Sequence, residues 1–92
     1  MRITCDPAKR AATLVDRNLD FLDAERVFAG RTVDWADDRH DYGEPRVVSA
    51  GFLDGRMVIL VWTPRGDARH VISMRKANDR EQKRLGQRFG EE

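Results

Sequence analysis

Three consecutive segments between Pro45 and Lys76 read as β-strands, the first two being apolar runs bounded by turn residues. Asp54-Gly55 separates the first two segments and is typical of a two-residue hairpin turn. That turn predicts three facing pairs, which are Phe52 with Met57, Ala50 with Ile59, and Val48 with Val61. We expect these side chains to form one apolar face of the sheet, covered by the helices of the N-terminal half.

The third segment, Ala68–Arg75, carries the candidate chemistry. Pro64 and Gly66 predict a turn before it, and this turn would pair Trp62 with Arg69 and Val58 with Ser73. Arg69, Ser73 and Arg75 are separated by even numbers of residues, so a regular strand would place them on one face. His70, Ile72 and Met74 would then point to the other face. The segment therefore predicts a basic, phosphate-sized site on an otherwise apolar sheet.

Patterns at the two ends of the chain predict the remaining elements. Arg2–Cys5 is a candidate edge strand, and Asp6-Pro7 is typical of a helix N-cap and first position. Apolar residues at helical spacing follow in two groups, one ending near Asn18 and one between Asp20 and Gly30. The first group comprises Ala8, Ala11, Ala12, Val15 and Leu19, and the second comprises Phe21, Ala24, Val27 and Phe28. We expect two short helices packed as a hairpin.

Arg31–Trp35 reads as a further strand, and Asn78 with Glu81 predicts a capping box at the start of a C-terminal helix. This last helix is weakly amphipathic and is expected along the edge of the sheet. The fold class is therefore α+β, with an N-terminal helical hairpin on a small, mainly antiparallel sheet and a C-terminal helix. Residues 1–92 form a single domain.

Composition narrows the class of protein. No segment approaches the about 18 consecutive apolar residues of a membrane span, and the N-terminus lacks the apolar core of a secretory signal. The single cysteine, Cys5, has no internal partner for a disulfide. We therefore predict a cytoplasmic protein that does not contact a membrane.

The formal net charge of +1 hides an asymmetry along the chain. Residues 1–64 sum to −2 and residues 65–90 sum to +5, and Glu91-Glu92 restores the total. A basic C-terminal third indicates an anion-binding surface. The alternative is that these arginines only keep a small protein soluble.

The loop Ala36–Glu44 is acidic and contains His40, the one histidine in a polar segment. An unperturbed imidazole exchanges protons near neutral pH, although a histidine in such a loop is often only solvated. Asp41 and Glu44 are alternative bases, or they hold the strand arginines by ion pairs. Trp62 is either a stacking platform for a base or part of the core. The two histidines lack metal-ligand spacing, so neither a metal nor another cofactor is expected.

Three motifs resemble the BrnT toxins of BrnT–BrnA type II toxin–antitoxin systems. They are Asp6-Pro7-Ala8-Lys9, then Arg39-His40-Asp41-Tyr42-Gly43-Glu44 with Arg46, and Arg69-x-x-Ile72-Ser73-x-Arg75-Lys76-Ala77. The likeness runs from Cys5 to about Arg88. The sequence departs from the family pattern at Asn18-Leu19, where a basic turn is usual, and at Pro64, where a glutamate is usual.

The resemblance implies a RelE-like fold and a ribonuclease that arrests translation. It also implies a BrnA-like ribbon-helix-helix antitoxin, through which operator DNA is bound. The family motif positions in this sequence are His40, Asp41, Glu44, Arg46, Arg65, Arg69, Ser73 and Arg75.

Metal-independent RNA cleavage requires a base, an acid and cations for the charge that develops on phosphorus. We assign Arg69 and Arg75 to charge stabilisation, Arg65 to orienting the scissile phosphate and Ser73 to positioning a phosphate oxygen. His40 or Glu44 is the candidate for proton transfer. Flanking phosphates would be bound by Arg46, Lys76, Arg80, Lys83 and Arg84.

Two alternatives remain open. The same basic face would also suit a non-enzymatic module that docks nucleic acid or an acidic partner protein. A toxin of this fold type acting on another target, such as a topoisomerase, is the second alternative.

Overall fold

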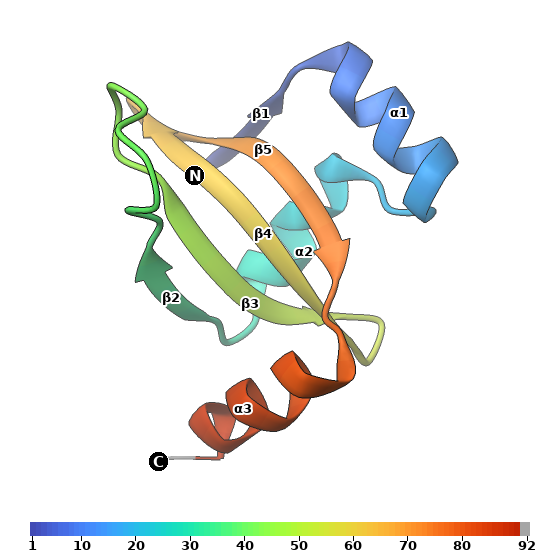
Figure 1. Cartoon of the computed structure of the whole chain (residues 1–92). Helices are drawn as coiled ribbons and strands as arrows, with labels where there is room; N and C mark the ends of the chain where they lie inside the picture. The colour runs from blue at the N-terminus through green and yellow to red at the C-terminus, as the bar shows by residue number, and fades with distance from the viewer. Residues whose placement is uncertain (91–92) are drawn as a thin grey trace.

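The computed structural model describes residues 1–90, in which one five-stranded sheet is flanked by three α-helices and a 3-10 helix (Figure 1). The strands are β1 (Arg2–Cys5), β2 (Val33–Ala36), β3 (Val47–Leu53), β4 (Arg56–Arg65) and β5 (Ala68–Lys76). The helices are α1 (Pro7–Arg17), η1 (Phe21–Asp23), α2 (Ala24–Ala29) and α3 (Asp79–Phe89). This confirms the predicted α+β class, while Glu91 and Glu92 of the predicted charge balance lie outside the described residues.

The strand order is β1-β5-β4-β3-β2, and β1 pairs with β5 in parallel whereas the other pairs are antiparallel. Within residues 1–90, no helix is both long enough and apolar enough to cross a membrane.

The β3–β4 hairpin confirms the turn and register predicted from Asp54-Gly55. Phe52 faces Met57, Ala50 faces Ile59 and Val48 faces Val61. Both turn residues have a positive φ, 51° at Asp54 and 77° at Gly55, which is the conformation that matches the twist of the two strands. The local turn chemistry was therefore sufficient to fix this part of the sheet.

The predicted register between β4 and β5 is wrong. The two strands extend to an Arg65–Ala68 pair, so Arg69 faces Pro64 and not Trp62. Further along, Val61 pairs with Ser73 while its neighbour Trp62 pairs with Val71, which leaves Ile72 as one extra residue in β5. Such a bulge resets the alternation of side chains along the strand.

The bulge divides the motif of β5 between two faces of the sheet. Before Ile72, Arg69 and Val71 lie on the face of Trp62; after it, Ser73 and Arg75 lie on the face of Val61 and Ile59. The prediction that Arg69, Ser73 and Arg75 share one face is therefore wrong.

The face opposite Ser73 is covered by η1 and α2. Leu19, Phe21, Ala24 and Val27 form a buried cluster there with Val58, Leu60, Val71 and Met74. Gly51 permits this close packing, because a Cβ atom at that position would lie 2.5 Å from Val27 Cγ1. We refer to this side of the sheet as the covered face.

The other side carries the six apolar residues of the predicted hairpin face, and it packs against α3. Its buried cluster contains Ala50, Met57 and Ile59 with Ala77 and Leu85, and Phe89 meets Phe52 with 5.0 Å between ring centroids. The prediction that the N-terminal helices cover this side is therefore wrong. Both sides of the hairpin are apolar, so the sequence pattern of the strands does not determine which helix packs on which side. The predicted capping box of α3 is confirmed: the Asn78 side chain accepts from Glu81 N, and Glu81 accepts from Asn78 N.

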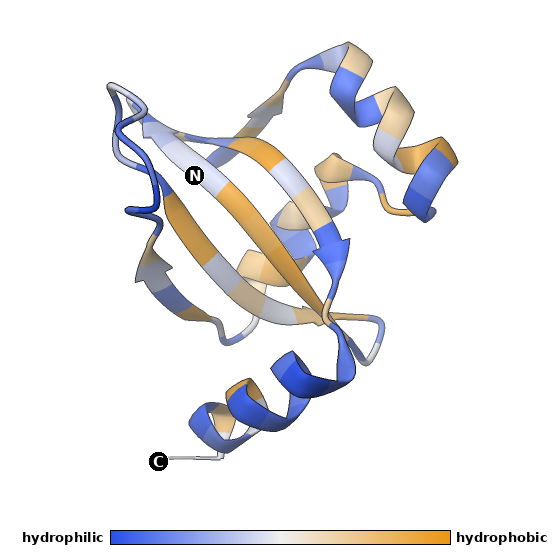
Figure 2. Cartoon of the chain, in the orientation of Figure 1, coloured by the Kyte–Doolittle hydropathy of each residue, from blue (hydrophilic) through white to orange (hydrophobic). Residues whose placement is uncertain are grey.

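α3 packs across only one end of this side and does not follow the sheet edge as predicted (Figure 1). In Figure 2 the residues of α3 are mostly hydrophilic, while β3 and β4 carry most of their hydrophobic residues along the middle of the sheet. The remainder of this side, around Ser73 and Arg75, is not covered by a helix, and we refer to it as the open face.

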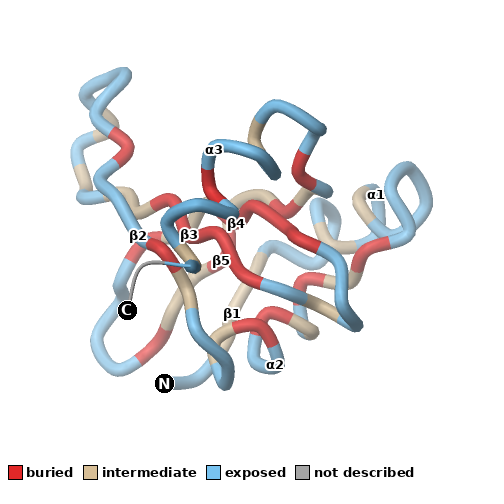
Figure 3. The backbone as a smooth tube through the Cα atoms, turned by 90° about the horizontal axis from the view of Figure 1, so that it is seen from below, coloured by how far each residue is buried: buried red, intermediate tan, exposed pale blue. Residues whose placement is uncertain are grey.

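The predicted edge strand Arg2–Cys5 is confirmed as β1, whereas the N-terminal helical hairpin is not confirmed, since α1 contains no buried residue. Of its predicted apolar stripe only Leu19, beyond the helix end, is buried, and Val15 is 84% exposed. Figure 3 shows α1 almost entirely exposed. Its polar side faces the body instead: Arg10 pairs with Asp20, and Arg17 donates to the Met74 carbonyl.

Candidate nucleic-acid interface

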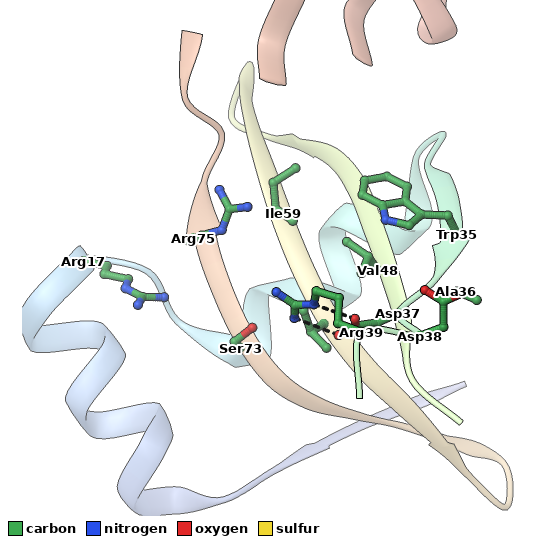
Figure 4. Close-up of a pocket in the computed structure, with 11 residues that line it drawn as sticks. Arg17, Trp35, Ala36, Asp37, Asp38, Arg39, Val48, Ile59, Ser73 and Arg75 are labelled. Carbon is green, nitrogen blue, oxygen red and sulfur yellow. Dashed lines mark hydrogen bonds and ion pairs between the residues drawn. The ribbon is translucent and has the colours of Figure 1, made fainter. Parts of the chain in front are cut away.

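A pocket of about 420 Å³ opens on the open face, between α1, the C-terminal end of β2 and β5. Its floor is apolar and formed by Val48, Ile59 and Val61, and its walls carry Arg17, Arg39, Ser73 and Arg75. Figure 4 shows the three guanidinium groups arriving from α1, β5 and the loop after β2. Guanidinium forks with a hydroxyl between them match the oxygens of a phosphate group.

Arg75 is held in place by a carboxylate of α3. Its two terminal nitrogens donate to the two oxygens of Glu81 at 2.7 Å each. The Arg75 guanidinium lowers the pKa of Glu81 to about 2, so the pair is ionised at neutral pH. The Arg75 side chain nevertheless remains 43% exposed, and a two-pronged contact from one side leaves its other N–H groups for a ligand.

Arg39 is fixed in a similar way by Asp37. Its Nε and one terminal nitrogen donate to the Asp37 carboxylate at 2.7 and 2.9 Å. These bonds lower the pKa of Asp37, which keeps this almost fully buried carboxylate charged. The Arg39 side chain is 71% exposed, so the loop presents to solvent a cation that Asp37 holds in place.

A second group of polar residues lies on the open face near the β4–β5 turn. Arg65, at the end of β4, lies 3.7 Å from Glu44. His70 of β5 faces Thr63 of β4. The Nδ1 atom of His70 lies 2.8 Å from Thr4 Oγ1 of β1. Burial, together with the positive charge of Arg65, lowers the pKa of His70, so its imidazole is neutral at pH 7.

The loop residues of the predicted site are less firmly placed. His40 is exposed and makes an edge-to-face contact with Tyr42, with 5.6 Å between ring centroids. Asp41 accepts from Gly43 N within the same loop. Arg46 stacks on Tyr42, with its guanidinium carbon 3.7 Å from the ring centroid. Tyr42 thus links the histidine to a cation at the edge of the open face.

Arg69 lies apart from all of these residues, on the covered face. Its guanidinium carbon is 4.0 Å from the Phe28 ring centroid and 5.1 Å from that of Trp62. Its Nε is a buried donor for which the described residues provide no acceptor. Trp62 is half-buried on the same face, and its indole N–H donates to Ser49 at 2.8 Å. Arg69 and Arg75 therefore do not surround one phosphate.

The predicted flanking cations are spread over the C-terminal part of the chain. Arg84 lines a small hollow with Trp35, which also borders the main pocket. Arg80 and Lys83 line a separate shallow hollow on α3. Lys76 is exposed at the end of β5, opposite Val58. Arg84 is thus connected to the main pocket through Trp35 and does not itself line it.

Sequence reasoning missed Arg17, Arg39 and His70. Arg17 occupies the last turn of α1, where a basic residue is ordinary, so it gave no signal. Arg39 stands beside His40 in a quoted motif, which was a usable signal. His70 was assigned to the core side because its face was expected to lie under the N-terminal helices, which in the structure cover the other face. In the described part of the chain, no three His, Cys, Asp or Glu residues are grouped so as to hold a metal ion.

A pocket lined by three arginines on a small α+β sheet is chemically suited to an anion, and comparison with known families identifies the class of protein. The sequence profile described as "Ribonuclease toxin, BrnT, of type II toxin-antitoxin system" matches residues 5–81. The chain therefore belongs to the BrnT family of ribonuclease toxins. A search of curated proteins found no match.

Proposed function

We propose that this protein is a metal-independent endoribonuclease that cleaves RNA in the cytoplasm and thereby inhibits translation. The supporting observation is the gathering of Arg17, Arg39 and Arg75 around Ser73 in a pocket with an apolar floor. The low polarity of such a floor strengthens the attraction between fixed cations and a phosphate. Family membership supports the reaction class, and a RelE-like arrangement of the fold belongs to the same proposal.

In this proposal Arg75 stabilises the negative charge that develops on phosphorus, since Glu81 holds it in a fixed orientation. Arg39 takes the second position that sequence analysis assigned to Arg69. Ser73 donates a hydrogen bond to a phosphate oxygen. Arg65 orients the phosphate at the turn end of the open face, and His40 or Glu44 remains a candidate for proton transfer.

Flanking phosphates would contact Arg46 and Arg84 next to the open face, and Lys76, Arg80 and Lys83 further away. Lys76, Arg80, Lys83 and Arg84 are exposed and Arg46 is half-buried, and such cations favour charge-based contacts that carry little sequence information.

The test is cleavage of a labelled single-stranded RNA in the presence of a chelator. Arg75→Ala should reduce the cleavage rate about 100-fold to 1,000-fold, by analogy with the loss of one fixed donor. Arg26→Ala is the matched control, because it also removes one arginine that is ion-paired to a carboxylate, Asp54, but far from the open face. Equal cleavage by Arg75→Ala and the intact protein would refute the proposed site. Retarded but uncut RNA would favour a binding module instead.

We further propose a BrnA-like ribbon-helix-helix protein as the antitoxin, with operator DNA bound only through that partner. Family membership supports a protein antitoxin. Expression of the chain alone should arrest growth, and co-expression of the protein encoded by the adjacent gene should restore it. Growth arrest that persists with Arg75→Ala would point to a target other than RNA.

A further inference from the structure

His70 lies on the open face between Arg65 and Ser73. His70 pairs with Thr63 of β4, and Ser73 pairs with Val61. Along β4, Thr63 is two residues from Arg65 on one side and two residues from Val61 on the other. At the rise of an extended strand, each step of two residues is about 7 Å. His70 is thus flanked at equal spacing by the arginine and the hydroxyl that the proposed function assigns to phosphate.

The imidazole is also oriented. Thr4 Oγ1 lies 2.8 Å from His70 Nδ1, and Thr4 comes from β1, which pairs directly with β5 at this point. When Nδ1 carries the proton and donates it to Thr4, the lone pair of Nε2 is available to accept another proton. His40, by contrast, lies in an exposed loop and contacts the ring of Tyr42.

Resting on the proposed function, we propose that His70 is a catalytic residue that accepts the ribose 2′-hydroxyl proton, and that Thr4 is its positioning residue. Nε2 takes the proton as the 2′-oxygen bonds to phosphorus, and the bond from phosphorus to the 5′-oxygen breaks. The departing 5′-oxygen takes a proton from water, and His70 returns its own to solvent. The products are a 2′,3′-cyclic phosphate and a 5′-hydroxyl, and no other reactant is consumed.

The charged groups around His70 favour a base at neutral pH. They are Arg65 on β4, Glu44 in the preceding loop, and Asp6 and Lys9 at the start of α1. Burial and Arg65 outweigh the two carboxylates and lower the pKa of His70. Cleavage should therefore rise with pH through a midpoint below the usual imidazole value of about 6.5 and level off before pH 7.

The experiment compares intact protein, His70→Gln and His40→Gln, with chelator present, between pH 5 and 9. Glutamine can still bond to Thr4 but cannot take up a proton, so His70→Gln should cleave at least about 100-fold more slowly and lose the rise at acid pH. Its affinity for an uncleavable 2′-O-methyl RNA should be unchanged. His40→Gln tests the competing assignment, and the rise of cleavage at acid pH should remain in this variant whatever its overall rate.

Thr4 provides a second test that does not alter the imidazole itself. Thr4→Val should lower kcat with little change in KM, because it removes the hydroxyl that orients the ring, and Thr4→Ser should restore kcat. These variants also keep the assignment testable if His70→Gln melts early in a circular dichroism scan.

Two failures are distinguishable. If the intact protein does not cut RNA, the proposed function fails and His70 loses its role with it. If the intact protein cuts RNA and His70→Gln cuts with the same rate and pH profile, only the assignment of His70 is overturned. A loss of the acid limb in His40→Gln alone would transfer the role to the loop.

Discussion

The ion pair between Arg75 and Glu81 joins the candidate site to the last helix, so replacing Glu81 with Gln tests its contribution to stability. The change keeps the size of the side chain and its ability to accept from Asn78 N in the capping box. It removes the charge that receives two hydrogen bonds of 2.7 Å from Arg75. The expected effect is a less stable protein at neutral pH.

The magnitude follows from the pKa of Glu81, which lies at about 2 against an ordinary 4.5. At 1.36 kcal/mol for each pKa unit, the difference corresponds to about 3 kcal/mol as an upper bound. Arg75 is 43% exposed, and solvent screening reduces the value of such a pair. We therefore expect a loss of about 1–2 kcal/mol, or roughly 4–8 °C in Tm for each kcal/mol in a domain of this size.

The direction of the pKa shift determines how this contribution to stability changes with pH. Because folding lowers the pKa of Glu81, its contribution is complete above the ordinary carboxyl pKa and disappears as the pH falls from about 4.5 to about 2. Thermal unfolding followed by circular dichroism should show a clear difference between Glu81→Gln and the intact protein at pH 7 that vanishes near pH 2. Asp34→Asn, on an exposed position of β2, is the control and should leave Tm within about 1–2 °C. A difference of the same size at both pH values would refute this reasoning.

Three further predictions concern other parts of the molecule. Gly51→Ala should destabilise the fold by about 1–3 kcal/mol in denaturant titrations, since its Cβ would lie 2.5 Å from Val27 Cγ1; an unchanged midpoint would show that α2 can move away. Ser49→Ala should cost about 1–3 kcal/mol, because it leaves the N–H of Trp62 without its 2.8 Å acceptor, and the tryptophan fluorescence transition would report it. Arg84→Ala should weaken binding of uncleavable RNA and reduce the slope of log affinity against log salt by about 0.7; an unaltered slope would place Arg84 outside the RNA path.

The parts of the fold that were predictable from sequence depend on local interactions. Asp54-Gly55 fixed the β3–β4 register through the backbone conformation of two adjacent residues. Asp6, Asn78 and Glu81 marked helix starts because each cap is completed within three residues. Such signals act over a few bonds and need no knowledge of the remaining chain.

The parts that failed depend on contacts between distant segments. Arg69 of β5 stacks on Phe28 of α2, which lies far from the β5 motif in the sequence. α1 turns Arg10 and Arg17 towards the body because Asp20 and the Met74 carbonyl accept from them, although its apolar stripe predicted the reverse. The arginines and serine of β5 were noticed from the sequence. Their division between two faces depends on the bulge at Ile72, which the sequence pattern did not reveal.

That bulge has a consequence for how related sequences are compared. In β5 odd-numbered residues lie on the covered face before Ile72 and on the open face after it. A linear motif that spans the bulge therefore joins side chains in two separate environments. Substitutions at Arg69 should covary with aromatic partners such as Phe28, whereas those at Ser73 and Arg75 should follow the chemistry of the substrate. If the strand lost the bulge without losing a residue, Arg69 would join Ser73 and Arg75 on one face, which makes the pairing register of β5 as strong a constraint as its composition.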